Sequence, residues 1–445
     1  MGDRLIWNDP SRREHVKMVD LGVKIAGLNL KNPLIVGAGP NTKNLPTAIH
    51  CMKGGFGAIV VRSLHMQYLH QRLEPVREFW RIYGNPKNIA EDLYSFQSTA
   101  APVQRINPKT ALGWGGAARI PVLEEWTEEV HKITRAAKGY DCAVIASIGW
   151  CGSNLSTEEL WKAEAKAMTE AGVDAIQLHS APSPATEPGR YITLDPERYL
   201  AEPIQAAKQA TPLPVFAKIP VDCCDTVGSA VIAQRAGAAG VVPVTRWLSI
   251  TVDTDHEKDP VWRGPGIGGP WSVPIMNGLI FRIRNAHHPV SYIFKGSTEQ
   301  FPEAVPVTIP IIASGGVRSG TDVLSYLIAG ANAAEICAQV ILEGPHIAGR
   351  IAEEMRTWMT QKGYRTIGEF QGTLRLLEHA EARNIPQWLA VVDGDLCNAC
   401  ETCVKACPNQ AISLVGNIAK VDVDYCEGCR TCYYVCPTGA ISLEP

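Results

Sequence analysis

Eight cysteines near the C-terminus share one spacing pattern. They form two copies of C-x2-C-x2-C-x3-C-P, the first at Cys397, Cys400, Cys403 and Cys407 and the second at Cys426, Cys429, Cys432 and Cys436. This run is typical of bacterial proteins that hold two 4Fe-4S clusters, in which the fourth cysteine of each run ligates the other cluster. The spacing therefore predicts one cluster on Cys397, Cys400, Cys403 and Cys436, and a second on Cys426, Cys429, Cys432 and Cys407.

Zinc and disulfide bonds fit these cysteines less well. A structural zinc site usually pairs two CxxC units whose thiolates saturate the ion, whereas each run here offers three close thiolates and a distant fourth. Disulfides are rare in the cytosol, and we expect no signal peptide on this chain. The sequence AlaIleSerLeu at 411–414 recurs at 440–443, at the same offset that separates Cys397 from Cys426. We therefore expect a short strand after each cluster loop, in a compact ferredoxin-like domain that folds around its metal.

Composition limits the partners. The 445 residues carry a net charge of -3 and a pI near 6.4, so nothing favours a nucleic acid or an acidic membrane surface. No apolar run reaches the length of a membrane-spanning helix. We expect a cytoplasmic protein in an anaerobic setting, because oxygen readily oxidises reduced clusters. Six further cysteines lack ligand spacing, and most are expected to be buried small hydrophobes: Cys51, Cys142, Cys151, Cys223, Cys224 and Cys337.

The region before the cysteine runs alternates short apolar runs with helical stretches, as parallel βα units do. The apolar runs number eight: Leu34–Gly39, Ala58–Arg62, Val144–Ile148, Ala175–His179, Val215–Ile219, Gly240–Val244, Ile311–Ser314 and Ala334–Ala338. Four of them follow a small-residue turn, at 54–57, 171–174, 236–239 and 329–332, where glycine supplies the left-handed conformation that ends a helix. Segments 124–138, 157–170 and 321–328 have the periodicity of amphipathic helices. Eight such units predict an α/β fold of the (β/α)8 TIM barrel type.

This organisation divides the chain into four parts. We expect an N-terminal extension over 1–20, the barrel over 21–362, a linker over 363–390 and the two-cluster domain over 391–445. Two segments, 68–120 and 251–269, are longer than a plain barrel needs and are expected to be lids or partner surfaces.

In such a barrel the chemistry lies on the loops after the carboxyl ends of the strands. SerGlyGly at 314–316 follows the seventh strand, and glycines there let backbone N–H groups face a phosphate. Barrels commonly bind phosphate between the loops after strands seven and eight. The glycines at 264–269 are not a dinucleotide fingerprint, because no strand is expected before them and no helix directly after them. We therefore expect the chain not to bind NAD(P)H itself and to exchange electrons with another protein.

Five motifs carry a resemblance to a known family: AsnProLeuIleValGlyAlaGlyPro at 32–40, IleAlaSerIle at 145–148, PheAlaLysIlePro at 216–220, IleProIleIleAlaSerGlyGlyVal at 309–317 and AlaGlyAlaAsnAlaAlaGluIleCys at 329–337. With the cysteine runs, the chain resembles the dihydroorotate dehydrogenase family and, within it, the FMN and iron-sulfur part of dihydropyrimidine dehydrogenase. The resemblance implies FMN, with Ala38 and Gly39 under the ring, Lys218 near its pyrimidine edge and Thr245 beside it. It also implies a phosphate site at Ser314, Gly315, Gly316, Ala338 and Gln339. A cation at the pyrimidine edge stabilises the reduced flavin electrostatically.

The chain departs from that family at two positions. Arg62 stands where the family has a second flavin-contacting lysine. The arginine keeps the positive charge but is longer and planar. Ala181 stands where the family has a cysteine that acts as general acid, and alanine cannot transfer a proton. His179, at the end of the fourth strand, is the first candidate for that role because histidine titrates near neutrality; the alternative is that it only binds, as the family's asparagine does there. The other candidates are Ser180, Ser183 and Cys151.

The leading hypothesis is an oxidoreductase that acts on a C=C or CH–CH bond of a cyclic substrate, which is pyrimidine-like, aromatic or otherwise conjugated. FMN would exchange two electrons with the substrate and each cluster one, to or from an NAD(P)H/FAD reductase subunit or a ferredoxin. Two alternatives stay open: a non-catalytic flavin and iron-sulfur electron-transfer subunit, and a redox-neutral flavin enzyme. We also expect a homo- or hetero-oligomer.

Overall fold

The computed structural model describes residues 19–63, 94–96, 123–149, 158–179, 200–220, 225–244, 247–248, 266–285, 306–376 and 388–444. Contacts divide the chain into two units, Met1–Leu374 and Arg375–Pro445. The division falls within the segment 363–390, which the sequence predicts as a linker. The first residues of that segment belong to the barrel unit, because Phe370 is buried against Trp358 and Tyr364.

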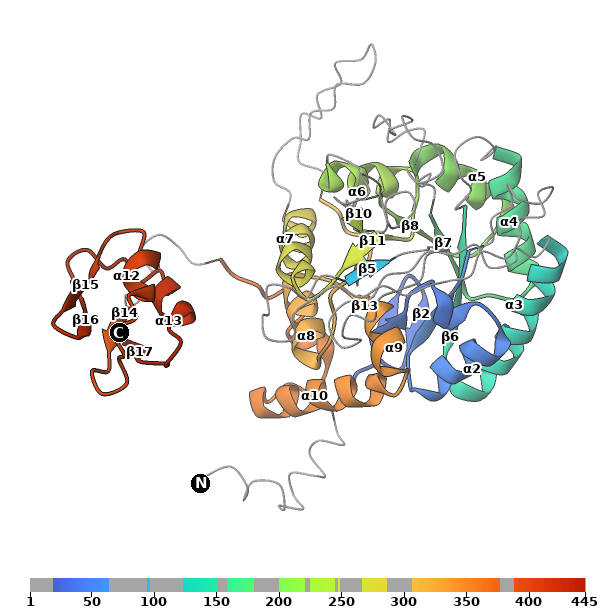
Figure 1. Ribbon diagram of the computed structural model, residues 1–445. Helices are drawn as coiled ribbons and strands as arrows, with labels where there is room; N and C mark the ends of the chain where they lie inside the picture. The colour runs from blue at the N-terminus through green and yellow to red at the C-terminus, as the bar shows by residue number, and fades with distance from the viewer. Residues whose placement is uncertain are drawn as a thin grey trace, which may run out of the picture. The chain divides into compact units, whose positions relative to one another are not determined.

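Eight parallel strands form the barrel, which confirms the predicted fold class (Figure 1). They are β3 (Leu34–Val36), β4 (Ala58–Val61), β6 (Ala143–Ile148), β7 (Ala175–Leu178), β8 (Val215–Lys218), β9 (Gly240–Val242), β12 (Ile312–Ser314) and β13 (Ala333–Ile336). Around the ring their order is β12-β13-β3-β4-β6-β7-β8-β9. A parallel bridge between Val241 and Ile311 joins β9 back to β12, so the ring closes and each strand lies beside the one that follows it in the barrel.

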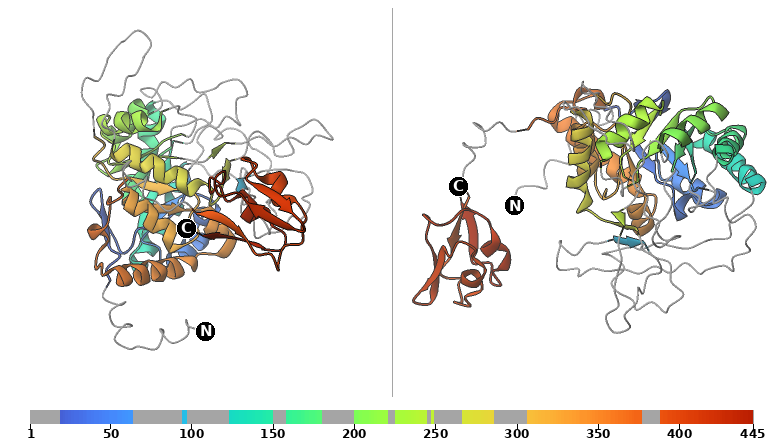
Figure 2. Two further views of the ribbon diagram at one scale, coloured as in Figure 1. Left: turned by 90° about the vertical axis from the view of Figure 1, so that its left-hand side faces the viewer. Right: turned by 90° about the horizontal axis from the view of Figure 1, so that it is seen from above.

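Helices pack around the outside of this ring (Figure 2). They are α2 (Leu45–Lys53), α3 (Leu123–Ala137), α4 (Glu158–Glu170), α5 (Glu202–Ala210), α6 (Thr226–Arg235), α7 (Ser272–Arg284), α8 (Gly320–Ala329), α9 (Ala338–Glu343) and α10 (Ile347–Lys362). Polar caps start several of them: the Asn44 side chain accepts from the Thr47 N–H at 3.1 Å, and Ser319 forms a capping box with Asp322. The turn glycines predicted to end the helices all have positive φ: Gly55, Gly172, Gly237 and Gly330.

The amino-terminal end of the barrel is filled by apolar side chains. Ile35, Phe216 and Val242 lie in one buried cluster with alanines from the starts of β4, β7 and β13. An antiparallel hairpin, β1 (Val23–Ile25) and β2 (Leu28–Leu30), adds Ile25 and Leu30 to the same cluster. Because the alanines of this cluster are the first residues of their strands, the hairpin lies at the amino-terminal end of the barrel.

The two long segments predicted as lids or partner surfaces meet each other in the barrel unit. β5 (Tyr94–Phe96), from the first segment, pairs antiparallel with β11 (Gly266–Gly268), from the second, and β11 pairs with β10 (Trp247–Leu248). α7 begins shortly after β11, so a helix does follow these glycines, although not directly. Most other residues of both segments lie outside the described part of the chain.

The C-terminal unit has the internal symmetry that the repeat predicts. β14 (Leu389–Val392) pairs with β17 (Ile441–Glu444), and β15 (Ile412–Val415) pairs with β16 (Ile418–Val421). Short helices α12 (Thr402–Ala406) and α13 (Thr431–Val435) carry cysteines of each run. β15 and β17 are the two strands expected after the cluster loops.

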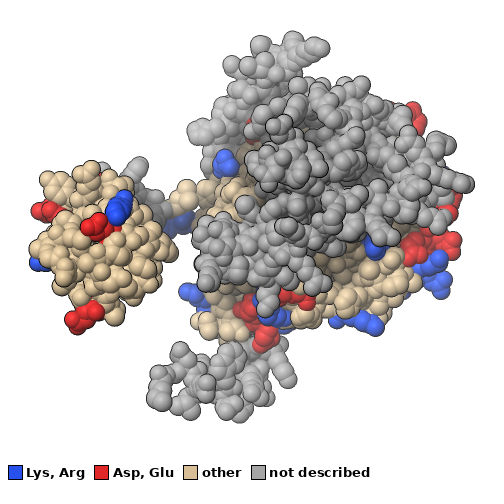
Figure 3. All heavy atoms as spheres, viewed as in Figure 1, with Lys and Arg blue, Asp and Glu red and all other residues tan. Residues whose placement is uncertain are grey.

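The described surface is of mixed charge. Where Figure 3 colours described residues, acidic and basic side chains lie near one another, in keeping with a net charge of -3. Among the described residues, none of the helices combines the length and the apolar character needed to cross a membrane.

Candidate active site

The loop after β12 forms a glycine cradle, defined here as Ser314, Gly315 and Gly316. Gly315 and Gly316 have φ values of 100° and 73°, a conformation that side chains disfavour. A Cβ on Gly316 would lie 2.7 Å from Ser272 Oγ at the start of α7, so glycine is also needed for this close approach. The buried Tyr326 hydroxyl donates to the Gly315 carbonyl at 2.6 Å. A partly exposed backbone with two successive glycines beside a helix start suits the phosphate end of FMN.

Ala338 and Gln339, which the resemblance also assigns to the phosphate, begin α9 directly after β13. The Gln339 side chain is buried, and its Nε2 donates to Glu343 Oε1 at 2.5 Å. The other oxygen of Glu343 accepts from Arg350 at 3.0 Å. In this structure the Gln339 amide therefore bonds within α9, and the assignment of Ala338 and Gln339 to the phosphate stays a prediction.

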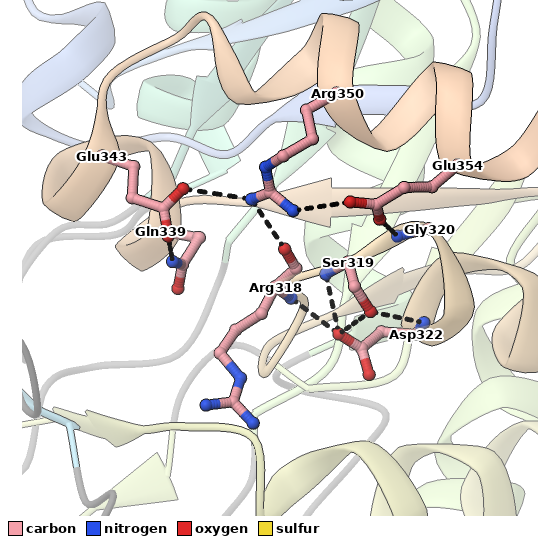
Figure 4. Close-up of polar contacts among 8 residues, drawn as sticks. All are labelled: Arg318, Ser319, Gly320, Asp322, Gln339, Glu343, Arg350 and Glu354. Carbon is pink, nitrogen blue, oxygen red and sulfur yellow. Dashed lines mark hydrogen bonds and ion pairs between the residues drawn. The ribbon is translucent and has the colours of Figure 1, made fainter. Parts of the chain in front are cut away.

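Arg350, on α10, joins α9 to the loop that follows the glycine cradle (Figure 4). It donates to the Arg318 carbonyl at 3.0 Å and to Glu354 at 2.9 Å, and Glu354 accepts from the Gly320 N–H at 2.6 Å. Figure 4 shows the Arg318 guanidinium pointing away from this network. The network fixes the loops after β12 and β13 relative to each other, which a two-sided phosphate site requires.

Lys218 lies at the carboxyl end of β8 and is buried rather than solvated. Its Nζ is 2.5 Å from Glu335 Oε1 on β13, with side-chain exposures of 9% and 3%. Gln177 on β7 closes a triangle, since its Nε2 donates to Glu335 at 3.0 Å and its Oε1 accepts from Lys218 at 3.3 Å. The residue that the resemblance assigns to the flavin therefore has a buried counter-ion.

Ala38, Gly39 and Arg62 lie at the same end of the barrel, after β3 and β4. Gly39 is extended and buried, and a Cβ there would lie 2.8 Å from Cys337 Sγ. Burial, with a smaller contribution from Glu335, raises the pKa of the Cys337 thiol to about 12, although Lys218 and Arg62 act to lower it. Cys337 is thus a neutral thiol, and the charges of Glu335, Lys218 and Arg62 all act near Gly39.

The proton-transfer candidates are only partly described. His179 follows β7 directly, and its backbone N–H donates to the Ile148 carbonyl at 2.9 Å, which fixes it at the carboxyl end of the barrel. Cys151, Ser180, Ser183 and the predicted flavin contact Thr245 lie outside the described residues.

Cys51 and Cys142 are buried, and burial raises the pKa of each thiol to about 12, as expected of small structural hydrophobes.

In the C-terminal unit, the cysteines gather around two cavities in the combination that the spacing predicts. Cys397, Cys400, Cys403 and Cys436 line one, and Cys426, Cys429, Cys432 and Cys407 line the other. Apolar side chains such as Ile441 and Leu443 complete the walls. No group of three or more His, Cys, Asp or Glu in the described chain is spaced for a single metal ion. Four cysteines that line one cavity suit a 4Fe-4S cluster, which is held by four cysteine thiolates.

The surroundings of the thiols favour metal binding. The Thr402 hydroxyl lies 3.4 Å from Cys400 Sγ, and the hydrogen bonds from Thr402 lower the pKa of this thiol; Thr431 does the same for Cys429. Backbone N–H groups also point at sulfur, as from Ala440 to Cys436 at 3.3 Å. Hydrogen bonds to sulfur stabilise the thiolate that binds iron and tune the cluster's reduction potential.

Comparison with known proteins agrees with both halves of this geometry. The sequence pattern described as dihydroorotate dehydrogenase matches residues 296–359, which include β12, α8, β13 and α9. The pattern described as 4Fe-4S dicluster domain matches residues 390–443. The carboxyl-terminal part of the barrel is therefore similar to the dihydroorotate dehydrogenase family, and a 4Fe-4S dicluster domain follows it. This places the chain among the flavin-dependent oxidoreductases.

Individual relatives of this family are distant. The NAD(+)-dependent dihydroorotate dehydrogenase B catalytic subunits of Oceanobacillus iheyensis and Pyrococcus abyssi are 25% and 26% identical, over 78% and 79% of this chain and 96% and 98% of their own. Dihydroorotate dehydrogenase A (fumarate) of Limosilactobacillus reuteri is 23% identical over 78% of this chain and 96% of its own. The finer likeness to dihydropyrimidine dehydrogenase stays a prediction.

Several residues of the site, Gln177 among them, were not singled out from the sequence. Glu335 offered the clearest signal, because an acidic residue inside the apolar run AlaAlaGluIle needs a buried partner. Tyr326 and Ser272 gave no local signal, since only the folded chain brings them to the glycine cradle.

Proposed function

We propose that this chain is an FMN- and iron-sulfur-dependent oxidoreductase that acts on a C=C or CH–CH bond of a cyclic, pyrimidine-like or otherwise conjugated substrate. Two 4Fe-4S clusters in the tail relay electrons to or from a partner reductase. The observation that carries the proposal is the buried Lys218 at the carboxyl end of a family barrel that shares its chain with two four-cysteine cavities. The names of the relatives support a catalytic subunit that works with a separate electron partner.

The residues of the barrel supply binding and orientation. FMN, when bound, converts between two-electron exchange with the substrate and one-electron exchange with the clusters. The glycine cradle would receive the phosphate, and Gly39, which has no side chain to collide with Cys337 Sγ, would lie under the ring. Lys218 donates a hydrogen bond at the pyrimidine edge and Arg62 adds a second positive charge.

His179 is proposed to hold the proton that the reaction needs, because Ala181 cannot. It stands at the strand end where the family places a residue that contacts the reacting ring, and imidazole can donate and accept a proton near neutral pH. His179→Gln should therefore lower turnover at least tenfold. His131→Gln, on the exposed face of α3, is the matched control and should leave turnover unchanged.

The test uses the full chain purified without oxygen. We expect one FMN and about eight irons per chain, as two 4Fe-4S clusters require. The flavin is then reduced, and orotate, uracil, thymine and other conjugated ring compounds are added one at a time while its absorbance is followed. Reoxidation by one of them identifies the substrate class.

Two results decide against the proposal. If no ring compound perturbs or reoxidises the flavin, the chain is a non-catalytic electron-transfer subunit, as the missing cysteine at 181 would allow. Turnover without net electron consumption would instead identify a redox-neutral flavin enzyme.

A further inference from the structure

The carboxylate of Glu335 occupies space that the fold keeps open for it. Gly37, just after β3, has no side chain, and a Cβ there would lie 2.7 Å from Glu335 Oε1. The neighbours of Glu335 along β13 are apolar, and the strand is buried on both faces. Because an unpaired charge is strongly unfavourable in such surroundings, Glu335 is held there by its contacts with Lys218 and Gln177.

Lys218 has one more N–H donor than its bonds to the described side chains use. An ammonium group has three N–H donors, and the described side chains take two of them, at Glu335 and Gln177. The third remains for a ligand at the carboxyl end of the barrel. Glu335 uses one oxygen for Lys218 and the other for Gln177, so the lysine is fixed in position from both sides.

The charges at this end of the barrel do not cancel completely. Lys218 and Arg62 are positive and Glu335 is negative, and all three act on the Cys337 thiol. That thiol is neutral, so it adds no further charge. Glu335 therefore reduces the net charge beside Gly39 from two positive charges to one.

We propose that Glu335 is a positioning residue that holds Lys218 at the flavin and compensates its charge, so that the flavin has a lower reduction potential than Lys218 alone would give. This inference rests on the proposed function, because it takes FMN as the ligand. Reduction adds two electrons and one proton to FMN near neutral pH, which leaves one negative charge on the ring. An uncompensated cation beside the ring favours that charge, whereas an ion pair favours it less.

The experiment compares the flavin potential of the full, cluster-loaded chain with that of Glu335→Gln at pH 6.5. Removing the carboxylate should favour the reduced flavin at least tenfold, which is about 30 mV for a two-electron couple. Glu164→Gln, which removes another buried carboxyl, is the matched control and should change the equilibrium less than twofold. An unchanged or lowered potential in Glu335→Gln with FMN bound overturns the inference.

A second comparison covers the case in which Glu335→Gln does not fold with a lone buried lysine. Lys218→Met together with Glu335→Gln replaces the ion pair by neutral side chains of similar size, and its potential should be higher than that of Lys218→Met alone. Equal potentials in these two variants overturn the inference. The FMN content of the purified chain distinguishes failure of the proposed function from failure of this inference. A wild-type chain without FMN refutes the proposed function. Bound FMN with unchanged potentials refutes only the role of Glu335.

Discussion

Glu164, on α4, should make the barrel less stable as the pH rises. This carboxyl is fully buried, and its Oε2 accepts from the Gly149 N–H at 2.7 Å. Burial raises its pKa from the ordinary 4.5 to about 8, and the Gly149 hydrogen bond opposes part of the rise. The folded protein therefore holds a proton on Glu164 between these pH values that the unfolded chain releases. The stability from this group is fully present below pH 4.5 and is lost as the pH rises through 8.

The size of the effect follows from the two pKa values. Values of 4.5 and about 8 correspond to a loss of at most about 5 kcal/mol at high pH. Roughly 2 kcal/mol of this is lost by pH 6, so about 3 kcal/mol should be lost between pH 6 and pH 9. Glu164→Gln keeps a carbonyl oxygen for the Gly149 N–H but does not titrate. The variant should therefore not lose this energy of about 3 kcal/mol between pH 6 and pH 9.

The assay is urea unfolding of the full chain, without oxygen, at pH 6 and pH 9, followed by tryptophan fluorescence. At each pH, the free energy of unfolding of the wild type is subtracted from that of Glu164→Gln. This difference should be about 3 kcal/mol larger at pH 9 than at pH 6. The contribution of the C-terminal unit is the same in both proteins and cancels. Glu170→Gln removes an exposed carboxyl from the same helix and serves as control. Parallel behaviour of wild type and Glu164→Gln at both pH values would refute the reasoning.

Three further changes test other parts of the molecule. Arg284→Met removes hydrogen bonds to three backbone carbonyls and one side chain and should lower the free energy of unfolding by about 3 kcal/mol in the same urea assay; a loss below 1 kcal/mol contradicts this. Gly316→Ala, with its Cβ 2.7 Å from Ser272 Oγ, should weaken FMN binding at least tenfold by titration of the apoprotein, with the circular dichroism unchanged. Cys407→Ala should remove the cluster of the second cysteine run and halve the iron content, whereas loss of the first run's cluster would reverse the proposed ligand pairing.

The barrel was predictable because its signals are local. Each strand is a short apolar run, and each of four turns contains a glycine with positive φ, so sequence neighbours alone reveal the units. The hairpin β1–β2 escaped prediction because its strands have three residues each, too few for a period to show. The pairing of β5 with β11 escaped because it joins two distant segments whose strands are equally short.

The cysteine ligands and Lys218 could be predicted from the sequence, but the ion pair between Lys218 and Glu335 could not. The cysteine sets followed from spacing, since the repeat fixes which sulfur returns to which cavity. Lys218 and Glu335 are 117 residues apart in the sequence, and no local pattern brings β8 and β13 together across the barrel. Resemblance gave Lys218 its place, yet only the folded chain shows that a carboxylate accompanies it.

That carboxylate changes how the two halves of the chain must be matched. A cation beside a flavin stabilises the reduced form, and two cations would make the flavin a deep sink for electrons. Electrons would then enter the barrel readily but would leave it slowly toward clusters of low potential. Under the proposal, Glu335 would cancel one of these positive charges and so would lower the flavin potential relative to two uncompensated cations. If Lys218 and Arg62 contact the flavin as proposed, the position of Glu335 on β13 would therefore influence how readily electrons pass between the flavin and the clusters.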